Sequence, residues 1–316
     1  MTTEPLSLVE ILGLSPWRLR LRQAALAIRG DGLTPPSRVG LSSRKILQPR
    51  LALALWRGQR PYGRQVPIYN LFNHTPTPVE DGWSLRKSSV RDFRGGTLTY
   101  DSHNATDFAT PPGTVVVAAA PARVVLAQSE YHRGGLKLLL DHGDGLMTTY
   151  VHLARALVAP GAVVARGQPI ALSGASGLNF PAAAFCDPPH LHFGTWLDGV
   201  AVDPFAHAGA ASLWRGGAPT PHRGAPEAAP PASEFDPAAV AAIIDGCRDR
   251  SLAATLAAEP DLARRAGAVI FARNYFPTRF ADHGSPYAAR HQRRPVLDLP
   301  FTSEDYDGVS FALAGA

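Results

Sequence analysis

The sequence predicts a mainly β protein: a small antiparallel β-sheet or sandwich, with an irregular N-terminal extension and a C-terminal helical extension. Between residues 97 and 199, short runs rich in Val, Leu and Thr alternate with Gly and Pro, which is typical of closely spaced strands joined by turns. No stretch between these runs is long enough for the crossover helix of a parallel sheet. Helix signals instead gather after residue 236.

Four segments follow one another along the chain. Residues 1–95 form an N-terminal extension of unknown function, in which an amphipathic pattern over 6–28 gives way to Pro- and Gly-rich loops. Residues 96–214 hold the predicted strands. Residues 215–235 are rich in Pro, Ala and Gly and too poor in large apolar side chains to pack, so we expect a linker. Residues 236–316 are expected to be a helical region and tail.

The C-terminal region carries explicit helix signals. Asp236 and Pro237 are an N-cap and first-turn pair, and the apolar pattern that follows predicts one helix over 238–259. A second helix is expected over 261–276, and the final apolar run at 308–314 could add a strand.

Composition limits the classes of function. The 316 residues are 45% hydrophobic and 18% charged, enough to bury a core, and 31 Lys and Arg against 26 Asp and Glu give a net charge of +5. This surplus is mild and not clustered, so we expect no nucleic-acid partner. Two cysteines, Cys186 and Cys247, cannot build a disulfide framework or a Cys-based zinc cluster. No apolar run reaches the roughly 18 residues of a transmembrane segment.

Five polar side chains inside the β-rich region point to chemistry. They are His103, Asp107, His152, His190 and His192. Imidazole and carboxylate are ligand types that zinc prefers. Because side chains alternate along a strand, His190 and His192 are expected to leave one face of the HLHF strand while Leu191 enters the core.

The number of these groups suggests a hydrolytic site. A catalytic zinc keeps three protein ligands and leaves the fourth position for water, whose pKa falls to about 7. Five donors exceed this requirement by two. The surplus pair fits a general base near the water and a donor of hydrogen bonds to the developing oxyanion and leaving amine.

Residues 96 to about 205 resemble the lysostaphin-type, or LytM-like, zinc metallopeptidases, which cleave peptide cross-links in bacterial peptidoglycan. The HxxxD and HxH motifs carry the resemblance, together with the stretches GTVVVAAAPARVV and VAPGAVVARGQPIALSGASG. The resemblance implies zinc as the cofactor, with His103, Asp107 and His192 as its ligands. It assigns His152 and His190 as catalytic residues, without deciding which is the general base.

This resemblance implies a zinc-dependent endopeptidase whose substrate is peptidoglycan cross-links or stem peptides. Departures from the family pattern bear on substrate preference. Ala105 stands where the family usually has Gly, and Gly194 where it has Glu after HLHF. The short link before HLHF is replaced by the longer run 178–189, which is expected to reshape one wall of the substrate groove.

Three alternatives remain open at this point. A degenerate scaffold that activates other wall hydrolases would have lost ligand residues, and a carrier module would need a modified Lys at a hairpin where DHGDG offers none. An intact peptidase could also act on a peptide outside the wall. The resemblance implies a periplasmic or cell-envelope location, but the N-terminus shows no clear signal peptide, so the cytoplasm is not excluded.

The remaining polar residues are assigned structural roles. Asp144 beside His142 is expected to shape a hairpin turn, Asp203 to fix the turn before Pro204, and Tyr150 to pack on the same face of its strand as His152. Five further histidines have no partner at metal-ligand spacing and are expected to be solvated. These are His132, His207, His222, His283 and His291.

Overall fold

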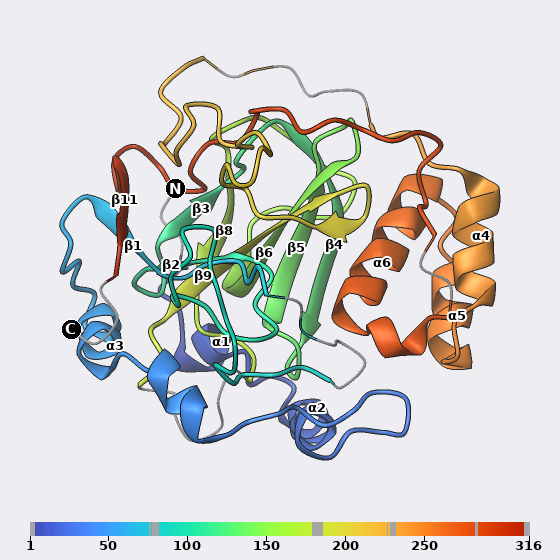
Figure 1. The fold of residues 1–316 in the computed structure, drawn as a ribbon, viewed down its shortest axis with the longest axis horizontal. Coiled ribbons are helices and arrows are strands. Elements are labelled where there is room, and N and C mark those ends of the chain that lie inside the picture. The colour runs from blue at the N-terminus through green and yellow to red at the C-terminus, as the bar shows by residue number, and fades with distance from the viewer. Residues whose placement is uncertain are drawn as a thin grey trace.

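The computed structural model describes residues 4–75, 77, 82–178, 186–225, 227, 232–281 and 284–312. Across these residues eleven strands form one sheet, which confirms the mainly β prediction (Figure 1). The main path through the sheet runs β11-β1-β2-β9-β6-β5-β4-β7, with β10 on β9, β8 on β6 and β3 on β8. All of these pairs are antiparallel except β1 with β11, so the sheet is mixed.

The strand bounds are β1 Gln65–Asn70, β2 Thr106–Ala109, β3 Val115–Val117, β4 Ala122–Glu130, β5 Gly135–Asp141, β6 Leu146–Ala156, β7 Val163–Val164, β8 Pro169–Ser173, β9 His190–Leu197, β10 Val200–Ala201 and β11 Gly308–Phe311. The helix bounds are α1 Leu8–Leu12, α2 Trp17–Arg29, α3 Pro49–Trp56, α4 Pro237–Asp245, α5 Arg250–Ala257 and α6 Leu262–Tyr275, with short 3-10 helices η1 Leu41–Ile46 and η3 Pro277–Arg279.

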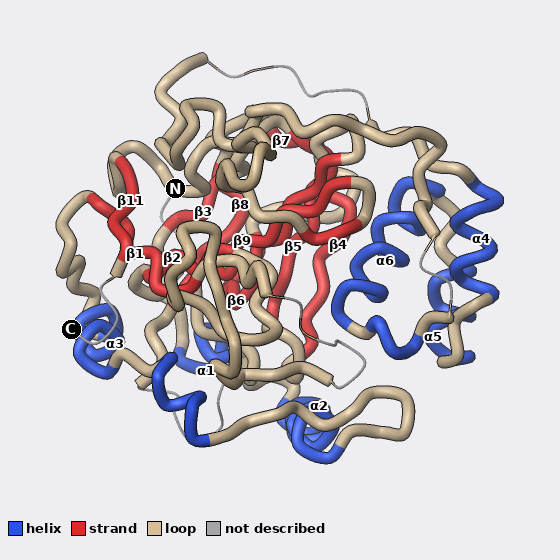
Figure 2. Tube along the Cα trace, in the orientation of Figure 1, coloured by secondary structure: helices blue, strands red, loops and turns tan. Residues whose placement is uncertain are grey.

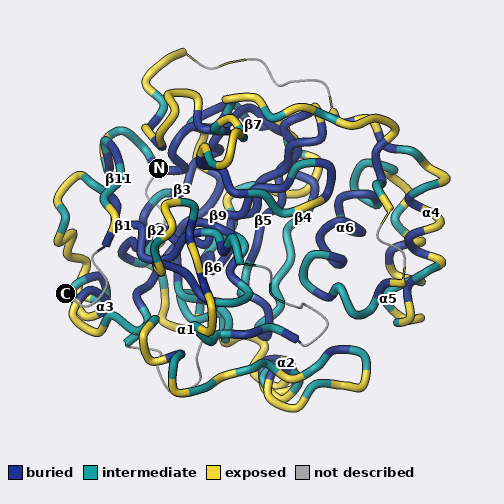
Figure 3. The backbone as a smooth tube through the Cα atoms, in the orientation of Figure 1, coloured by how far each residue is buried: buried dark blue, intermediate teal, exposed yellow. Residues whose placement is uncertain are grey.

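The central strands are buried on both faces (Figure 3). Alternation along β5 sends Leu138 and Leu140 into a core shared with Phe108, Phe193 and other strand residues. Leu139, between them, faces a second core formed with α4, α5 and α6. The C-terminal helices therefore cover the β4–β5 end of the sheet, as Figure 2 shows, and are part of the folded body.

Two strands from distant parts of the sequence extend the sheet beyond the predicted range 96–214. β1 pairs antiparallel with β2, and β11 pairs parallel with β1, with Val66 opposite Val309. Residues 308–311 of the final apolar run thus form a strand, as the sequence predicts, while residues 313 and 314 lie outside the described residues. The N-terminal extension contributes β1, which sequence analysis did not recognise.

The helices differ from prediction in two places. The single pattern over 6–28 is two helices, because Gly13 ends α1 in the left-handed conformation and Pro16 precedes α2. The single helix predicted over 238–259 is also two. It stops after Asp245, and the Asp249 carboxylate then accepts the N–H groups of Ser251 and Leu252 as a new N-cap.

The segment predicted as a linker is partly described, since residues 226 and 228–231 lie outside the described residues. Its first residue, Arg215, donates to Asp298, and near its end Ser233 donates to Asp141, so both ends are fixed to the body. Cys186 and Cys247 are free thiols. Within the described ranges, no helix has the length and apolar character needed to cross a membrane.

We predict that Gly267→Ala destabilises the protein, because α6 approaches β4 so closely that a Cβ at this position would overlap Val125 Cγ1. Overpacking costs about 1–3 kcal/mol, against a gain of about 1 kcal/mol from replacing Gly by Ala in a helix. Denaturant unfolding should show a net loss of about 1 kcal/mol. Combining the change with Val125→Ala should relieve the overlap, and purely additive effects of the two changes would contradict the packing argument.

Candidate metal centre

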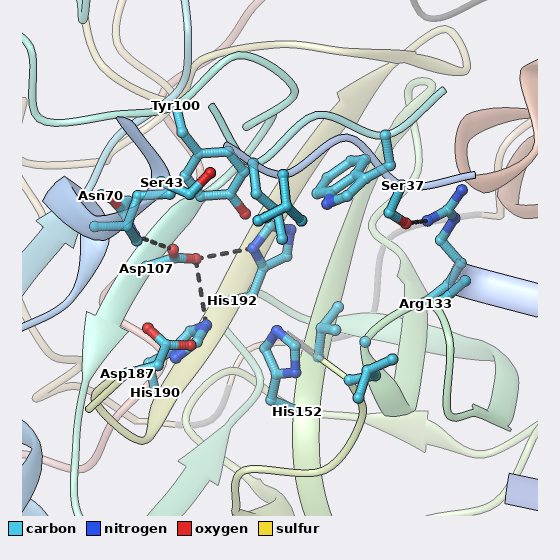
Figure 4. Close-up of a pocket in the computed structure, with 18 of the residues that line it drawn as sticks. Ser37, Ser43, Asn70, Tyr100, Asp107, Arg133, His152, Asp187, His190 and His192 are labelled. Carbon is cyan, nitrogen blue, oxygen red and sulfur yellow. Dashed lines mark hydrogen bonds and ion pairs between the residues drawn. The ribbon is translucent and has the colours of Figure 1, made fainter. Parts of the chain in front are cut away.

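The five side chains singled out in the sequence lie together in the structure. β2, β9 and β6 are neighbours in the sheet, and their register puts Asp107 opposite His192, and His192 opposite Val151 next to His152. His103 lies in the loop just before β2. Figure 4 shows Asp107, His152, His190 and His192 converging from these strands.

Strand alternation accounts for the two histidines of β9. His190 and His192 face the site, whereas Leu191 and Phe193 are fully buried in the core between the strands. The backbone conformation predicted from HLHF is therefore the observed one.

His152 points into the site because of a β-bulge, not because of regular strand alternation. β6 has one extra residue between its pairings with Leu138 and Leu136, a β-bulge, and His152 adopts a φ of 63° there. Tyr150 is consequently in the core, where its hydroxyl accepts the Ala119 N–H, and His152 is turned into the site. The prediction that both share one face is wrong, because the bulge breaks the alternation.

Three groups present ligand atoms within 4.8 Å of one another: His103, Asp107 and His192. His103 Nδ1 is 2.7 Å from the Leu71 carbonyl oxygen, which can only accept, so this nitrogen carries the proton and Nε2 has the lone pair. His103 Nε2 is 2.9 Å from Asp107 Oδ2, but it makes no hydrogen bond to any described residue. His192 Nδ1 lies 2.8 Å from Asp107 Oδ1.

This arrangement fits a divalent metal. His103 is 1% exposed, and leaving a buried imidazole nitrogen without a partner is costly. Two imidazole nitrogens and one carboxylate form a donor set that zinc takes with an open position. Binding at His192 Nδ1 would displace the proton that this atom now shares with Asp107.

Asp107 is held as a carboxylate although it is buried. Burial acts to raise its pKa, but His103, His190 and His192 lower it more, so its pKa lies well below 3.8. Asn70 Nδ2 also donates to Asp107 Oδ2 at 3.0 Å. The carboxylate is therefore a fixed negative charge at the centre of the imidazoles.

The other two histidines are oriented alike. His152 Nδ1 donates to the Ser176 carbonyl at 2.8 Å, and His190 Nδ1 lies 2.7 Å from the Pro188 carbonyl. In both rings Nε2 therefore has the lone pair. His190 Nε2 lies 3.9 Å from Asp107 Oδ1, and the centroids of the two rings are 4.5 Å apart. Burial, then His190 and His192, lower the pKa of His152 well below 6.5. Both Nε2 atoms can accept a proton.

Three consecutive residues of the N-terminal segment support the site, and sequence analysis missed them. Tyr69 Oη lies 2.7 Å from His190 Nδ1, Asn70 donates to Asp107, and the Leu71 carbonyl accepts from His103. Their only sequence signal is the short apolar run of β1, with its aromatic residue and β-branched residues. That run lies outside the stretch that carries the family resemblance.

A cavity of about 340 Å³ opens at these groups. Asp107, His152, His190 and His192 line one side. The N-terminal segment lines the cavity too, through Ala27, Ile28, Val39, Ile46 and Leu47. Leu178 and Asp187, from the two ends of the run 178–189, also reach the cavity, while residues 179–185 lie outside the described residues.

The histidines that are expected to play no part in the centre differ in their burial and in their hydrogen-bond partners. His142 is at the predicted hairpin turn, bonded to the Pro121 carbonyl and Thr148. His132 is not solvated as expected but buried, and burial lowers its pKa to about 4. His222 and His291 are paired with Asp298 and Asp198. His283 lies outside the described residues, and His207 is treated below.

Comparison with known proteins identifies the fold of this region. Residues 101–204 match the sequence model of Peptidase family M23. The chain carries an M23 peptidase domain. This M23 domain holds all five of the residues singled out, and it begins after the supporting residues of β1.

Relatives of the M23 domain include wall enzymes and an activator. The peptidoglycan DD-endopeptidase ShyA of Vibrio cholerae is 35% identical over 127 residues, which cover 40% of this chain and 28% of ShyA. The murein hydrolase activator EnvC of Escherichia coli is 41% identical over 93 residues, covering 29% of this chain and 20% of EnvC. The chain therefore spans about a quarter of the length of these relatives.

Among solved structures, a zinc-containing peptidase from Vibrio cholerae is 31% identical to the chain. The matched region covers 46% of this chain and 39% of the chain of that peptidase, with a TM-score of 0.32.

We predict that Asn70→Ala weakens metal binding at the centre by about 10- to 100-fold, because supporting hydrogen bonds to a metal-binding carboxylate have effects of this size. Competition with a chelator would measure the change. Asn274→Ala is the matched control, since among the described residues its side chain donates to the Gly199 and Ile270 carbonyls, and it should leave the affinity unchanged. Equal affinity in the Asn70 variant and wild type would contradict the supporting role.

Proposed function

We propose that the chain is a zinc-dependent metalloendopeptidase that hydrolyses peptide bonds in peptidoglycan cross-links or stem peptides. One observation carries the proposal: three ligand-type atoms within 4.8 Å of one another are buried beside two histidines whose Nδ1 atoms contact backbone carbonyls. The M23 domain and the named activity of ShyA support the reaction and the substrate class.

In this proposal His103, Asp107 and His192 hold the ion, through Nε2, a carboxylate oxygen and Nδ1. Zinc, when bound, polarises a peptide carbonyl and makes water acidic enough to attack near neutral pH. The Leu71 carbonyl and Asn70 fix His103 and Asp107 in the orientation that presents these atoms.

His152 and His190 move the protons. Each ring donates its Nδ1–H to a backbone carbonyl, so a proton taken up at Nε2 creates an imidazolium that still keeps this bond. One Nε2 accepts a proton from the attacking water, and the pair returns a proton to the leaving amine. Tyr69 is a positioning residue for His190, since its hydroxyl lies 2.7 Å from the ring.

The substrate would approach through the cavity between the M23 domain and the N-terminal segment. Apolar side chains of the segment line this cavity together with the histidines, which favours an uncharged stretch of peptide next to the scissile bond. A wall substrate places the protein in the periplasm or at the cell envelope. The mild positive charge of the chain suits an anionic polymer of this kind.

The second candidate is a non-catalytic activator of wall hydrolases. The similarity to EnvC favours it, because that relative is named as an activator. The complete set of five residues weighs against it, since an activator has no need for two oriented histidines beside three ligand-type atoms.

We predict that His192→Ala lowers the zinc content by about one ion per chain and abolishes hydrolysis of purified peptidoglycan. His152→Ala and His190→Ala should keep this zinc and lose activity by about 100- to 10,000-fold, because they remove proton transfer only. Elemental analysis and release of soluble wall fragments measure the two effects. His291→Asn, at a histidine paired with Asp198 outside the centre, is the control.

Two results would decide against parts of the proposal. Equal zinc in wild type and the His192 variant would refute the ligand assignment. Zinc-loaded protein that cleaves no wall preparation, yet stimulates another wall hydrolase, would establish the activator function instead.

A further inference from the structure

A second group of metal-type ligands lies outside the centre described above. It consists of His74, in the loop after β1, with Asp203 and His207, which follow β10. His74 Nε2 is 2.7 Å from Asp203 Oδ2, and the rings of His74 and His207 have centroids 4.4 Å apart at 78°. One ligand atom from each of the three residues lies within 4.8 Å of the others.

The loop that carries two of these ligands is internally ordered. Asp203 Oδ1 accepts the Phe205 N–H at 2.9 Å, which is the turn-forming role predicted for this residue. His207 Nδ1 donates to the Phe205 carbonyl at 2.8 Å, so its Nε2 keeps the lone pair. An imidazole that donates one N–H to a backbone carbonyl and presents the other nitrogen is the usual state of a metal-ligating histidine.

Arg293 contacts the backbone of the loop that carries Asp203 and His207. Arg293 Nη2 donates to the backbone carbonyls of Asp203 and Phe205, so the guanidinium secures the loop without binding the carboxylate. The carboxylate itself is buried, with the Asp203 side chain 1% exposed, whereas His74 is 25% exposed. A buried carboxylate with a partly open imidazole beside it can exchange its hydrogen bond for an ion.

The group also has access to solvent and to the first centre. His74, Asp203 and His207 line a cavity of about 680 Å³, and His103 and Asn104 line the same cavity. An ion bound there would have room for ligands other than protein. It would lie on the wall of a cavity that reaches the loop carrying a ligand of the first centre.

We propose that His74, Asp203 and His207 form a second binding site for a divalent transition-metal ion, of which zinc is the preferred one. The donors are two imidazole nitrogens and one carboxylate oxygen, the same set as in the first centre. The ion ties the loop after β1 to the loop after β10, with its open position facing the cavity. The site exists whether or not the first centre is catalytic.

Sequence spacing explains why this site was not expected. Asp203 and His207 are four residues apart, as are His103 and Asp107, but the third ligand is 129 residues before Asp203. Spacing along the sequence therefore indicates no metal-binding partner for His207. β10 pairs with the edge of β9 that also carries β2, and β1 lies on the other side of β2, so the loops that follow β1 and β10 meet.

The test counts ions on the full chain. Protein stripped with a chelator is dialysed against Zn²⁺ alone, and the metal content per chain is measured. Wild type should bind two ions and His207→Asn one, because the new amide can still donate to the Phe205 carbonyl but lacks an atom at the position of Nε2. His291→Asn makes the same replacement where the amide can keep a bond to Asp198, and it should bind two.

Two further variants keep the proposal open to refutation. Asp203→Asn should also bind one ion while keeping the Phe205 contact, which guards against misfolding of the His207 variant. His192→Ala should bind one ion, and combining it with His207→Asn none. One ion in both wild type and the His207 variant would overturn the second site and leave the first untouched. Two ions in His192→Ala, with one in His207→Asn, would refute the first assignment and support the second.

Discussion

The buried carboxylate of Asp107 is the constraint on which the site depends. A charge that is 1% exposed is tolerable only where polar partners surround it, and here Asn70 donates to the carboxylate and His192 Nδ1 lies 2.8 Å from it. Each partner is supplied by a different part of the chain. The sheet order β1-β2-β9 is what brings these parts together around one residue of β2.

The residues that support the site extend beyond the M23 domain. Tyr69, Asn70 and Leu71 precede the matched range, yet each contacts one of the five site residues or fixes its protonated nitrogen. The N-terminal segment also contributes part of the cavity wall. A relative that shares only the matched range would need other groups for these tasks, so the surroundings of the five residues can differ between proteins that share the domain.

The sequence predicts correctly those structural features that depend on local periodicity and on the spacing of motifs. The β-rich region, the N-cap at Asp236, and the common face of His190 and His192 all depend on residues close in sequence, and the structure has each of them. The bulge at His152 could not be read from alternation, because it reflects how β6 pairs with β5 and β9. The contacts of Tyr69 and the His74 cluster depend on pairings across more than a hundred residues, for which a single sequence carries no local signal.

The parallel pair of β1 and β11 has a consequence for synthesis of the chain. β11 begins about 240 residues after β1 ends, and at about 5–20 residues per second this separation corresponds to roughly 10 to 50 s on the ribosome. During that interval β1 can pair with β2, but its other edge has no strand to cover it. The nascent protein therefore exposes the free edge of β1, next to the strand that carries Asp107, until β11 emerges.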